Sequence, residues 1–269
     1  MSPAPPPGIG ARLDAARAIV DDAARRAHAL FRDVDALEVD VKGRQDWVSN
    51  ADREVESAMR AALAARFPDD GIVGEEHGDV PGTSGLTWVI DPIDGTTSFV
   101  GGTPGWCVVL ACVDAAGTLI GVVRDPVADE TFTAARGAGA RLNGRPIAVT
   151  RATALTEGST AVGHNTRVEA GATLALLERL LAGGGMFYRS GSGALMLCYV
   201  AAGRLIGYCE PHMNGWDCMA AMLVIEEAGG TVRGFDPGEM MARGGRAVAG
   251  GPGTYPLLLA MTDEAFGAE

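Results

Sequence analysis

Two early segments carry apolar residues at every third or fourth position, which is the spacing of one buried helix face. The first segment covers residues 13–34. The second begins near residues 49–52 with acidic side chains in its first turn, and Pro68 ends it after Phe67. The pattern therefore predicts two amphipathic helices before residue 70.

Short apolar runs bounded by turn residues replace this spacing in the next part of the chain. They predict strands at residues 72–74, 88–90, 106–113, 119–124 and 130–134. The dipeptide Asn143-Gly144 is typical of a tight hairpin turn. The order of these runs favours an antiparallel sheet.

From about residue 150 helical and strand-like segments alternate. We predict helices at 169–181, 194–202, 217–228 and 255–261, with strands at 160–163, 187–189, 206–208 and 247–249. The alternation indicates an α+β or α/β chain whose two parts meet at a gradual boundary near residue 150. Residues 1–150 would hold the early helices and the antiparallel sheet, and residues 151–269 would complete one compact whole.

Composition and charge exclude several classes of protein. Of 269 residues 47% are apolar, enough for a sizeable core, and the net charge of −12 argues against a general binder of nucleic acid or anionic membranes. The longest apolar run, 106–113, is too short to cross a bilayer, and the first ten residues lack a signal-peptide pattern. Five scattered cysteines without a C-x-x-C pair fit a reducing compartment. We expect a cytoplasmic protein.

Carboxylates stand directly after two predicted strands and at the start of a later helix: Glu75, Glu76, Asp91, Asp94 and Asp217. Strand ends and helix starts often face a shared crevice, although any one of these acids alone would be an ordinary loop acid or cap. At contact distance two carboxylates repel by about 4 kcal/mol at an effective dielectric of 20. Either some of them are protonated or a cation lies among them.

The chemistry of these side chains favours a hard cation. Oxygen ligands, together with four histidines that lack zinc-type spacing, favour Mg²⁺, Mn²⁺ or Ca²⁺. Paired Mg²⁺ ions are a common device for hydrolysing phosphate esters. Gly95, Thr96 and Thr97 follow the acids and could supply N–H groups and hydroxyls to an anion. The segment predicts a metal-dependent phosphatase.

A covalent alternative resembles the haloacid-dehalogenase phosphatases, which also place Asp-Gly-Thr after a strand. Their nucleophilic Asp lies two residues before that Asp, and here this position is Pro92. The earlier acid, Asp91, is three residues away, so the covalent route has no nucleophile at the required spacing.

Two signatures and a third segment resemble the inositol monophosphatase family over nearly the whole chain. The first is WVIDPIDGTTSF at 88–99 with Gly-Glu-Glu at 74–76, and the second runs from Trp216-Asp217 to Glu-Ala-Gly-Gly at 227–230. Lys42 with residues 46–52 forms the third. The resemblance implies a layered αβαβα sandwich of the inositol monophosphatase and fructose-1,6-bisphosphatase type, usually dimeric. It also implies a Mg²⁺-dependent, lithium-sensitive phosphatase with two to three ions.

The resemblance further implies roles for individual residues. Glu75, Asp91 and the Ile93 carbonyl would hold one metal, and Asp91, Asp94 and Asp217 a second, with Glu75 helping a weaker third. Thr96 with Asp52 would orient and deprotonate the attacking water, beside Glu75. The remaining matches would bind phosphate and substrate hydroxyls: Gly95, Thr96, Thr97, Ser192, Gly193, Ala194 and Glu210. Ser49, Ser98 and residues 212–215 depart from the family pattern, which leaves the substrate end open.

The predicted function is hydrolysis of a small polyol or sugar monophosphate by direct attack of a metal-activated water, with inositol 1-phosphate as the default substrate. Histidinol phosphate, fructose 1,6-bisphosphate and 3′-phosphoadenosine 5′-phosphate are alternatives within the same chemistry. An inactive metal-binding regulatory protein would lack a metal ligand or the water activator, and neither is missing from the sequence. A homodimer without nucleic-acid or membrane partners is expected.

Overall fold

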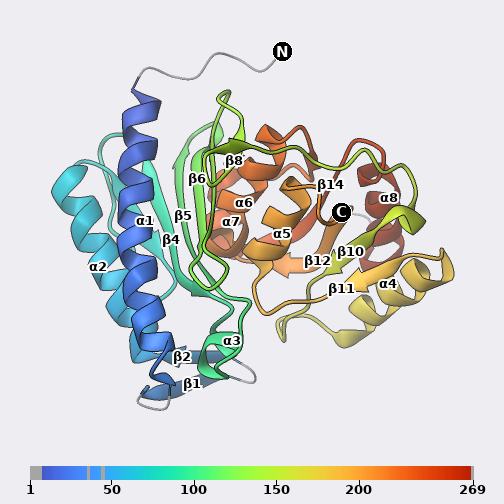
Figure 1. Cartoon of the computed structure of the whole chain (residues 1–269), viewed down its shortest axis with the longest axis horizontal. Coiled ribbons are helices and arrows are strands. Elements are labelled where there is room, and N and C mark those ends of the chain that lie inside the picture. Colours follow the sequence, from blue (N-terminus) through green and yellow to red (C-terminus); the bar gives the residue numbers. More distant parts are fainter. Residues whose placement is uncertain (1–7, 35–36, 44–45, 268–269) are drawn as a thin grey trace.

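The computed structural model describes residues 8–34, 37–43 and 46–267, with the side chains of 41–48 outside that description. The side chain of Lys42, in the third segment that resembles the family, therefore lies outside the description. Two sheets and three helix layers alternate along the longest axis (Figure 1). The order is helices, sheet, helices, sheet, helices, which confirms the predicted αβαβα sandwich.

The first sheet has seven strands in the order β3-β4-β5-β6-β7-β8-β9. Only β3 and β4 are parallel; every other neighbouring pair is antiparallel, as the sequence predicted. The strands are β3 (Gly71–Gly74), β4 (Thr87–Asp94), β5 (Cys107–Asp114), β6 (Gly117–Asp125), β7 (Glu130–Ala135), β8 (Ala140–Leu142) and β9 (Arg145–Pro146).

The second sheet has five strands in the order β11-β10-β12-β14-β13. Strand β10 is parallel to β11 and β12, whereas β14 is antiparallel to β12 and β13. The strands are β10 (Ser159–Val162), β11 (Met186–Tyr188), β12 (Gly207–Met213), β13 (Thr231–Val232) and β14 (Gly245–Gly250). A separate hairpin pairs β1 (Val39–Gly43) with β2 (Asp46–Ser49).

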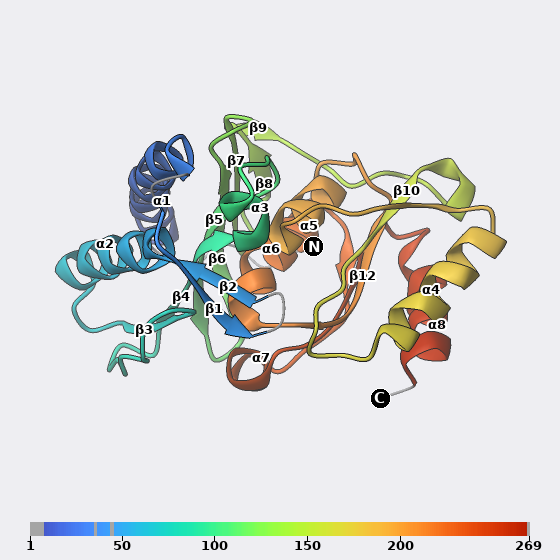
Figure 2. The ribbon, with the colours of Figure 1, turned by 90° about the horizontal axis from the view of Figure 1, so that it is seen from below.

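Helices form the outer and middle layers (Figure 2). Helices α1 and α2 cover one face of the first sheet, α5 and α6 lie between the sheets, and α4 and α8 cover the far face of the second. Their bounds are α1 (Ile9–Phe31), α2 (Asn50–Arg66), α3 (Thr96–Val100), α4 (Ala170–Ala182), α5 (Gly193–Ala201), α6 (Gly215–Glu227), α7 (Pro237–Arg243) and α8 (Tyr255–Phe266), with a 3₁₀ turn at Leu155–Glu157.

The layering explains why β5 reads as an unbroken apolar run rather than an alternating one. Val108 and Leu110 pack toward α1 and α2, while Val109 and Ala111 pack into the core shared with α5 and α6. A strand buried on both faces needs apolar residues at every position. Gly121 of β6 lets α6 approach closely, since a Cβ there would lie 2.4 Å from the carbonyl oxygen of Ala220.

Two strands continue past the points where the apolar runs stop. Strand β4 extends through Asp91 and Asp94, and β12 extends through Glu210. Each extension contains a proline, Pro92 or Pro211, and the pairing register shifts at that place. Proline has no backbone N–H to donate to the ladder, and at a bulge no such hydrogen bond is needed. The strand therefore continues past the proline. The acids therefore lie on strands rather than in the loops after them.

Candidate active site

A cavity of about 550 Å³ lies where the two halves of the chain meet. Strands β4 and β12 and the N-terminal ends of α5 and α6 contribute to its wall. Nearly all of the predicted site residues line it; Asp52, Ser192 and Ala194 lie immediately behind the wall. The structure thus brings together residues that are up to 165 positions apart, from Asp52 to Asp217.

Three carboxylates form the centre of the cavity wall. One oxygen each of Glu75, Asp91 and Asp217 lies within 4.8 Å of the others. The parallel pairing of β3 and β4 explains two of them: Gly74 is the last residue of β3 and pairs with Ile90, so Glu75 and Asp91 follow side by side. Asp217 comes from the first turn of α6, where its carboxylate accepts the backbone N–H of Asn214 at 3.3 Å.

Burial and mutual repulsion disfavour the ionised forms of these acids. The pKa of Asp91 is raised well above its ordinary value by burial and then by the charges of Glu75, Asp94 and Asp217. Burial, followed by the charge of Asp94, also raises the pKa of Asp217. A cation bound here would remove both penalties. The all-oxygen donor set fits a hard divalent cation such as Mg²⁺.

Asp94 lies beside this trio but is held from the other side. Its Oδ2 accepts the Ser192 hydroxyl at 2.5 Å and the backbone N–H of Ala194 at 2.7 Å. Ser192 is the N-cap of α5, so Asp94 joins the first sheet to the positive end of this helix. Ser192, Gly193 and Ala194, which the sequence assigned to a substrate loop, are thus also the residues that hold Asp94.

Thr96 and Asp52 lie together, as the proposed water-activating pair requires. The Thr96 hydroxyl is 3.4 Å from Asp52 Oδ1 and donates at 3.0 Å to the carbonyl oxygen of Ile93. Asp52 Oδ2 accepts from Ser49 N at 2.8 Å and Ser49 Oγ at 2.7 Å, in the capping box of α2. This leaves Oδ1 facing Thr96. Burial is the main cause that raises the pKa of Asp52, which makes it a better proton acceptor.

The turn after β4 requires glycine. Gly95 has φ +96°, and a Cβ there would lie 2.7 Å from the carbonyl oxygen of Gly105. The turn places the N-terminal residues of α3, Thr96 and Thr97, along the cavity wall. Backbone N–H groups of such a turn are free to face an anion.

Glu210 occupies another part of the cavity. Its carboxylate accepts from the Tyr208 hydroxyl and, at 3.0 Å, from the side-chain amide of Asn165. Burial raises the pKa of Glu210 to about 7, although these hydrogen bonds and the charge of Arg189 oppose the shift. Arg167 and Arg189 also line the cavity. This region therefore combines a hydrogen-bonded carboxyl group with two cations.

The residues that hold these acids were not predicted from the sequence. Asn165 and Tyr208 hold Glu210, and Glu56 of α2 holds the chain directly after Glu75. No periodicity or motif singled out these three residues. The polar doublet of Asn165 with His164 after a buried strand was the available signal for the first of them.

Comparison with known proteins agrees with this architecture. The model of the inositol monophosphatase family matches residues 11–265, and the chain belongs to this family of phosphatases. It is 37% identical to the Nus factor SuhB of Haemophilus influenzae, over 87% of this chain and 89% of that one. It is 38% identical to the inositol-1-monophosphatase of Mesorhizobium japonicum, over 86% and 90%.

Solved structures agree as well. The extragenic suppressor protein SuhB of Bartonella henselae superimposes with a TM-score of 0.89 at 31% identity, covering 94% of this chain and 99% of that one.

Among the described residues no helix combines the length and apolarity needed to cross a membrane.

Proposed function

We propose that this protein is a Mg²⁺-dependent phosphomonoesterase acting on a small polyol or sugar monophosphate, with inositol 1-phosphate as the first candidate. The observation that carries the proposal is the convergence of Glu75, Asp91 and Asp217 within 4.8 Å, next to the Thr96–Asp52 pair. Membership of the inositol monophosphatase family supports it.

Each group of residues has a part in this reaction. Glu75, Asp91, Asp94, Asp217 and the Ile93 carbonyl would hold two to three ions, which when bound lower the pKa of the attacking water and neutralise charge on the phosphate. Thr96 would orient that water and pass its proton toward Asp52. The N–H groups at Gly95 and Thr96, with the Thr97 hydroxyl, would bind the phosphate oxygens.

Glu210 supports a polyhydroxylated alcohol as the leaving group. At neutral pH a carboxyl group with a pKa of about 7 can accept or donate a hydrogen bond, and both suit a sugar hydroxyl. The positive charges of Arg167 and Arg189 would offset additional negative charge on the substrate. The same features would accept histidinol phosphate or fructose 1,6-bisphosphate, so the substrate has to be measured.

A phosphate-release screen tests the proposal. Purified protein would be offered about twenty phosphomonoesters with Mg²⁺, and kcat/KM compared for each. We expect Mg²⁺-dependent turnover that is highest on a polyol monophosphate, together with inhibition by Li⁺ and excess Ca²⁺. Absence of hydrolysis for every ester in saturating Mg²⁺ would refute the proposal.

We also propose a cytoplasmic homodimer. The edge strand β11 and the adjoining helix α4 expose large apolar side chains, including Met186 at 62% and Leu174 at 63% exposure. A second copy of the chain could cover this surface. Light scattering of the purified protein measures the mass directly, and a monomer at micromolar concentration would contradict this assembly.

A second candidate function comes from the relatives named Nus factor SuhB. The two functions can be separated, because hydrolysis needs the acidic cluster whereas a role as a Nus factor need not. Asp91→Asn, expected to abolish hydrolysis, can be tested for complementation in bacteria that lack their own Nus factor SuhB. Complementation by this variant but not by an empty vector would support the second role.

A further inference from the structure

The segment that begins at Glu75 lies directly beyond the β3–β4 ladder. The β3–β4 ladder ends at Gly74 and Ile90, so Glu75 begins the segment Glu75–Asp79, which returns to the sheet where Val80 bridges Ile72. Glu75 and Asp91 lie close together with like charge, and repulsion between them favours moving Glu75 away. Contacts that do not depend on a metal can oppose this repulsion.

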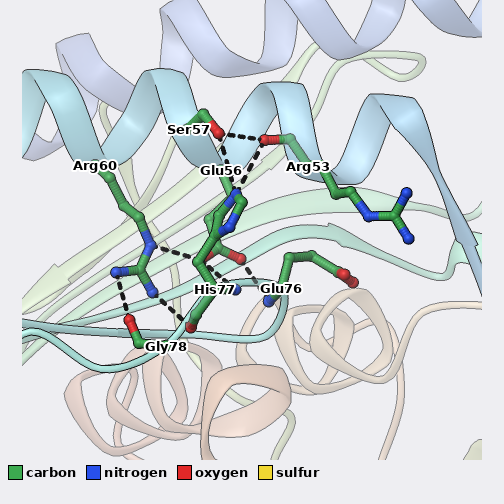
Figure 3. A network of polar contacts seen from close by, with 7 residues as sticks. All are labelled: Arg53, Glu56, Ser57, Arg60, Glu76, His77 and Gly78. Atoms are coloured by element: carbon green, nitrogen blue, oxygen red, sulfur yellow. Dashed lines mark hydrogen bonds and ion pairs between the residues drawn. The ribbon is translucent and has the colours of Figure 1, made fainter.

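Figure 3 shows that α2 holds this segment with the side chains of Glu56 and Arg60, and that the Ser57 hydroxyl also lies 3.0 Å from His77 Nε2. The Glu56 carboxylate is fully buried and accepts the backbone N–H of Glu76 at 2.7 Å and of His77 at 3.2 Å. These are the two peptide groups that follow Glu75. Fixing them fixes the direction in which the Glu75 side chain leaves the chain.

Arg60 completes the arrangement from the other side. Its Nε donates to Glu56 Oε1 at 2.6 Å, and its two terminal nitrogens donate to the carbonyl oxygens of His77 and Gly78 at 3.0 Å each. The guanidinium fork thus joins the carboxylate to the segment that it holds. Since the pair is neutral overall, it adds no net charge beside the acidic cluster.

The glycine before Glu75 is explained by the same contact. A Cβ at Gly74 would lie 2.2 Å from Glu56 Oε1 and 2.9 Å from a terminal nitrogen of Arg60. Gly74 needs no unusual backbone angle, so the space taken by Glu56 is what excludes a side chain there. The Gly-Glu-Glu sequence therefore places the candidate metal ligand Glu75 next to Glu56 and Arg60 of α2. We call these two side chains the clamp.

We propose that Glu56 and Arg60 are positioning residues that hold Glu75 in its metal-binding orientation before any metal binds. The inference rests on the proposed function, because it takes Glu75 as a metal ligand. Groups that hold a metal ligand in place typically contribute about 10–100-fold to metal affinity. The clamp acts on metal binding and not on the substrate.

Three variants break the clamp by different means. Glu56→Gln turns an acceptor oxygen into an NH₂ group, Arg60→Lys keeps the charge but loses the fork, and Gly74→Ala displaces the carboxylate without removing any polar group. Arg53→Gln is the matched control: it removes an exposed ion pair with Asp40 on the same helix, and its guanidinium points away from the segment (Figure 3).

The main readout is Mn²⁺ binding to metal-stripped protein, followed by electron paramagnetic resonance of the free ion. We expect the Kd of Glu56→Gln and Gly74→Ala to rise about 10–100-fold, that of Arg60→Lys to rise less, and that of Arg53→Gln to stay unchanged. At saturating Mg²⁺ kcat should recover to within a few-fold. Circular dichroism identifies which variants are folded, and any one of the three that is folded is sufficient for the test.

Hydrogen exchange supplies a readout that depends on neither metal nor activity. Without metal, the amides of Glu76 and His77 should exchange faster in the variants than in wild type and in Arg53→Gln. Folded variants with wild-type Mn²⁺ affinity and wild-type exchange at these amides would overturn the clamp while leaving the phosphatase intact. A wild-type protein that binds no Mn²⁺ would instead overturn the proposed function and, with it, the clamp.

Discussion

Two groups of residues at the cavity are held in different ways, and we call them the acidic end and the Glu210 end. The acidic end consists of Glu75, Asp91, Asp94 and Asp217 with Thr96 and Asp52, and the Glu210 end consists of Glu210 with Asn165, Tyr208, Arg167 and Arg189. At the acidic end backbone elements hold several of the acids: Asp52 and Asp217 in capping boxes and Asp94 at the N-terminus of α5.

At the Glu210 end the carboxylate is held, within the described part of the chain, by hydrogen bonds from other side chains and not from the backbone. Glu210 receives its hydrogen bonds from Tyr208 and Asn165, and the arginines beside it are exposed. Backbone-held groups keep their positions when neighbours change, whereas a side-chain network can be altered one residue at a time. Under the proposed function we expect the acidic end to carry the chemistry and the Glu210 end to select the alcohol.

The largest effect is expected for Asp91, which is the most buried member of the acidic trio. Asp91→Asn removes a charge that both proposed metal positions share. Losing several kcal/mol of transition-state stabilisation corresponds to a fall in kcat of about 10⁴-fold or more. Phosphate release at saturating Mg²⁺ measures it, with Asp129→Asn, an exposed loop acid, as control. A less than tenfold loss would remove Asp91 from the centre of the mechanism.

The Thr96–Asp52 pair comes next. Thr96→Ala and Asp52→Asn should each lower kcat by about 10²–10⁴-fold, the usual contribution of a general base, while Mg²⁺ and substrate affinities change little. Because the two residues act as a unit, the double variant should be hardly worse than either single variant. Fully multiplicative losses would leave Asp52 as a helix-capping acid only.

Glu210→Gln should change selectivity rather than chemistry. Losing a charged hydrogen bond costs about 1.5–3 kcal/mol, so kcat/KM for a polyol phosphate should fall about 10–150-fold. An aryl phosphate without hydroxyls should be hydrolysed as before, and Glu264→Gln, an exposed matched change, should affect neither. Equal losses on both esters would contradict the division between the two ends.

The last prediction concerns stability rather than activity and follows from the raised pKa of Glu210. Folding raises it from 4.5 to about 7, so folding favours the protonated acid and stability is lost as pH rises through this window. Between pH 5 and pH 8 wild type should lose about 2–3 kcal/mol more stability than Glu210→Gln, which keeps only the pH dependence of the other buried acids. Urea unfolding in chelator measures the difference; parallel curves for both proteins would refute it.

The site residues and the side chains that hold them differ in how well the sequence predicts them. Asp91, Asp94, Thr96 and Thr97 lie within a few residues and Asp217 opens a predicted helix, so local pattern singles them out. The role of Asp52 came from the family resemblance alone. Asn165 is 45 positions from Glu210, and Glu56 is 20 positions from Glu76. Such partners follow from packing, which no spacing along the chain encodes.

The fold shows the same limit. Periodicity revealed the long helices and the central strands because their apolar faces extend over many residues. Strand β13 has two residues and α7 has seven, which is too short for a periodic signal. The predicted strands end at residues 90 and 208, but bulges beside Pro92 and Pro211 let β4 and β12 continue and bring Asp91 and Glu210 onto strands.

The central claim is that the acidic end hydrolyses phosphate esters only with a divalent metal. The direct measurement is phosphate release from p-nitrophenyl phosphate by metal-stripped enzyme, first in excess chelator and then with increasing Mg²⁺. We expect no turnover in chelator and saturable recovery with Mg²⁺. Undiminished hydrolysis in excess chelator would contradict it.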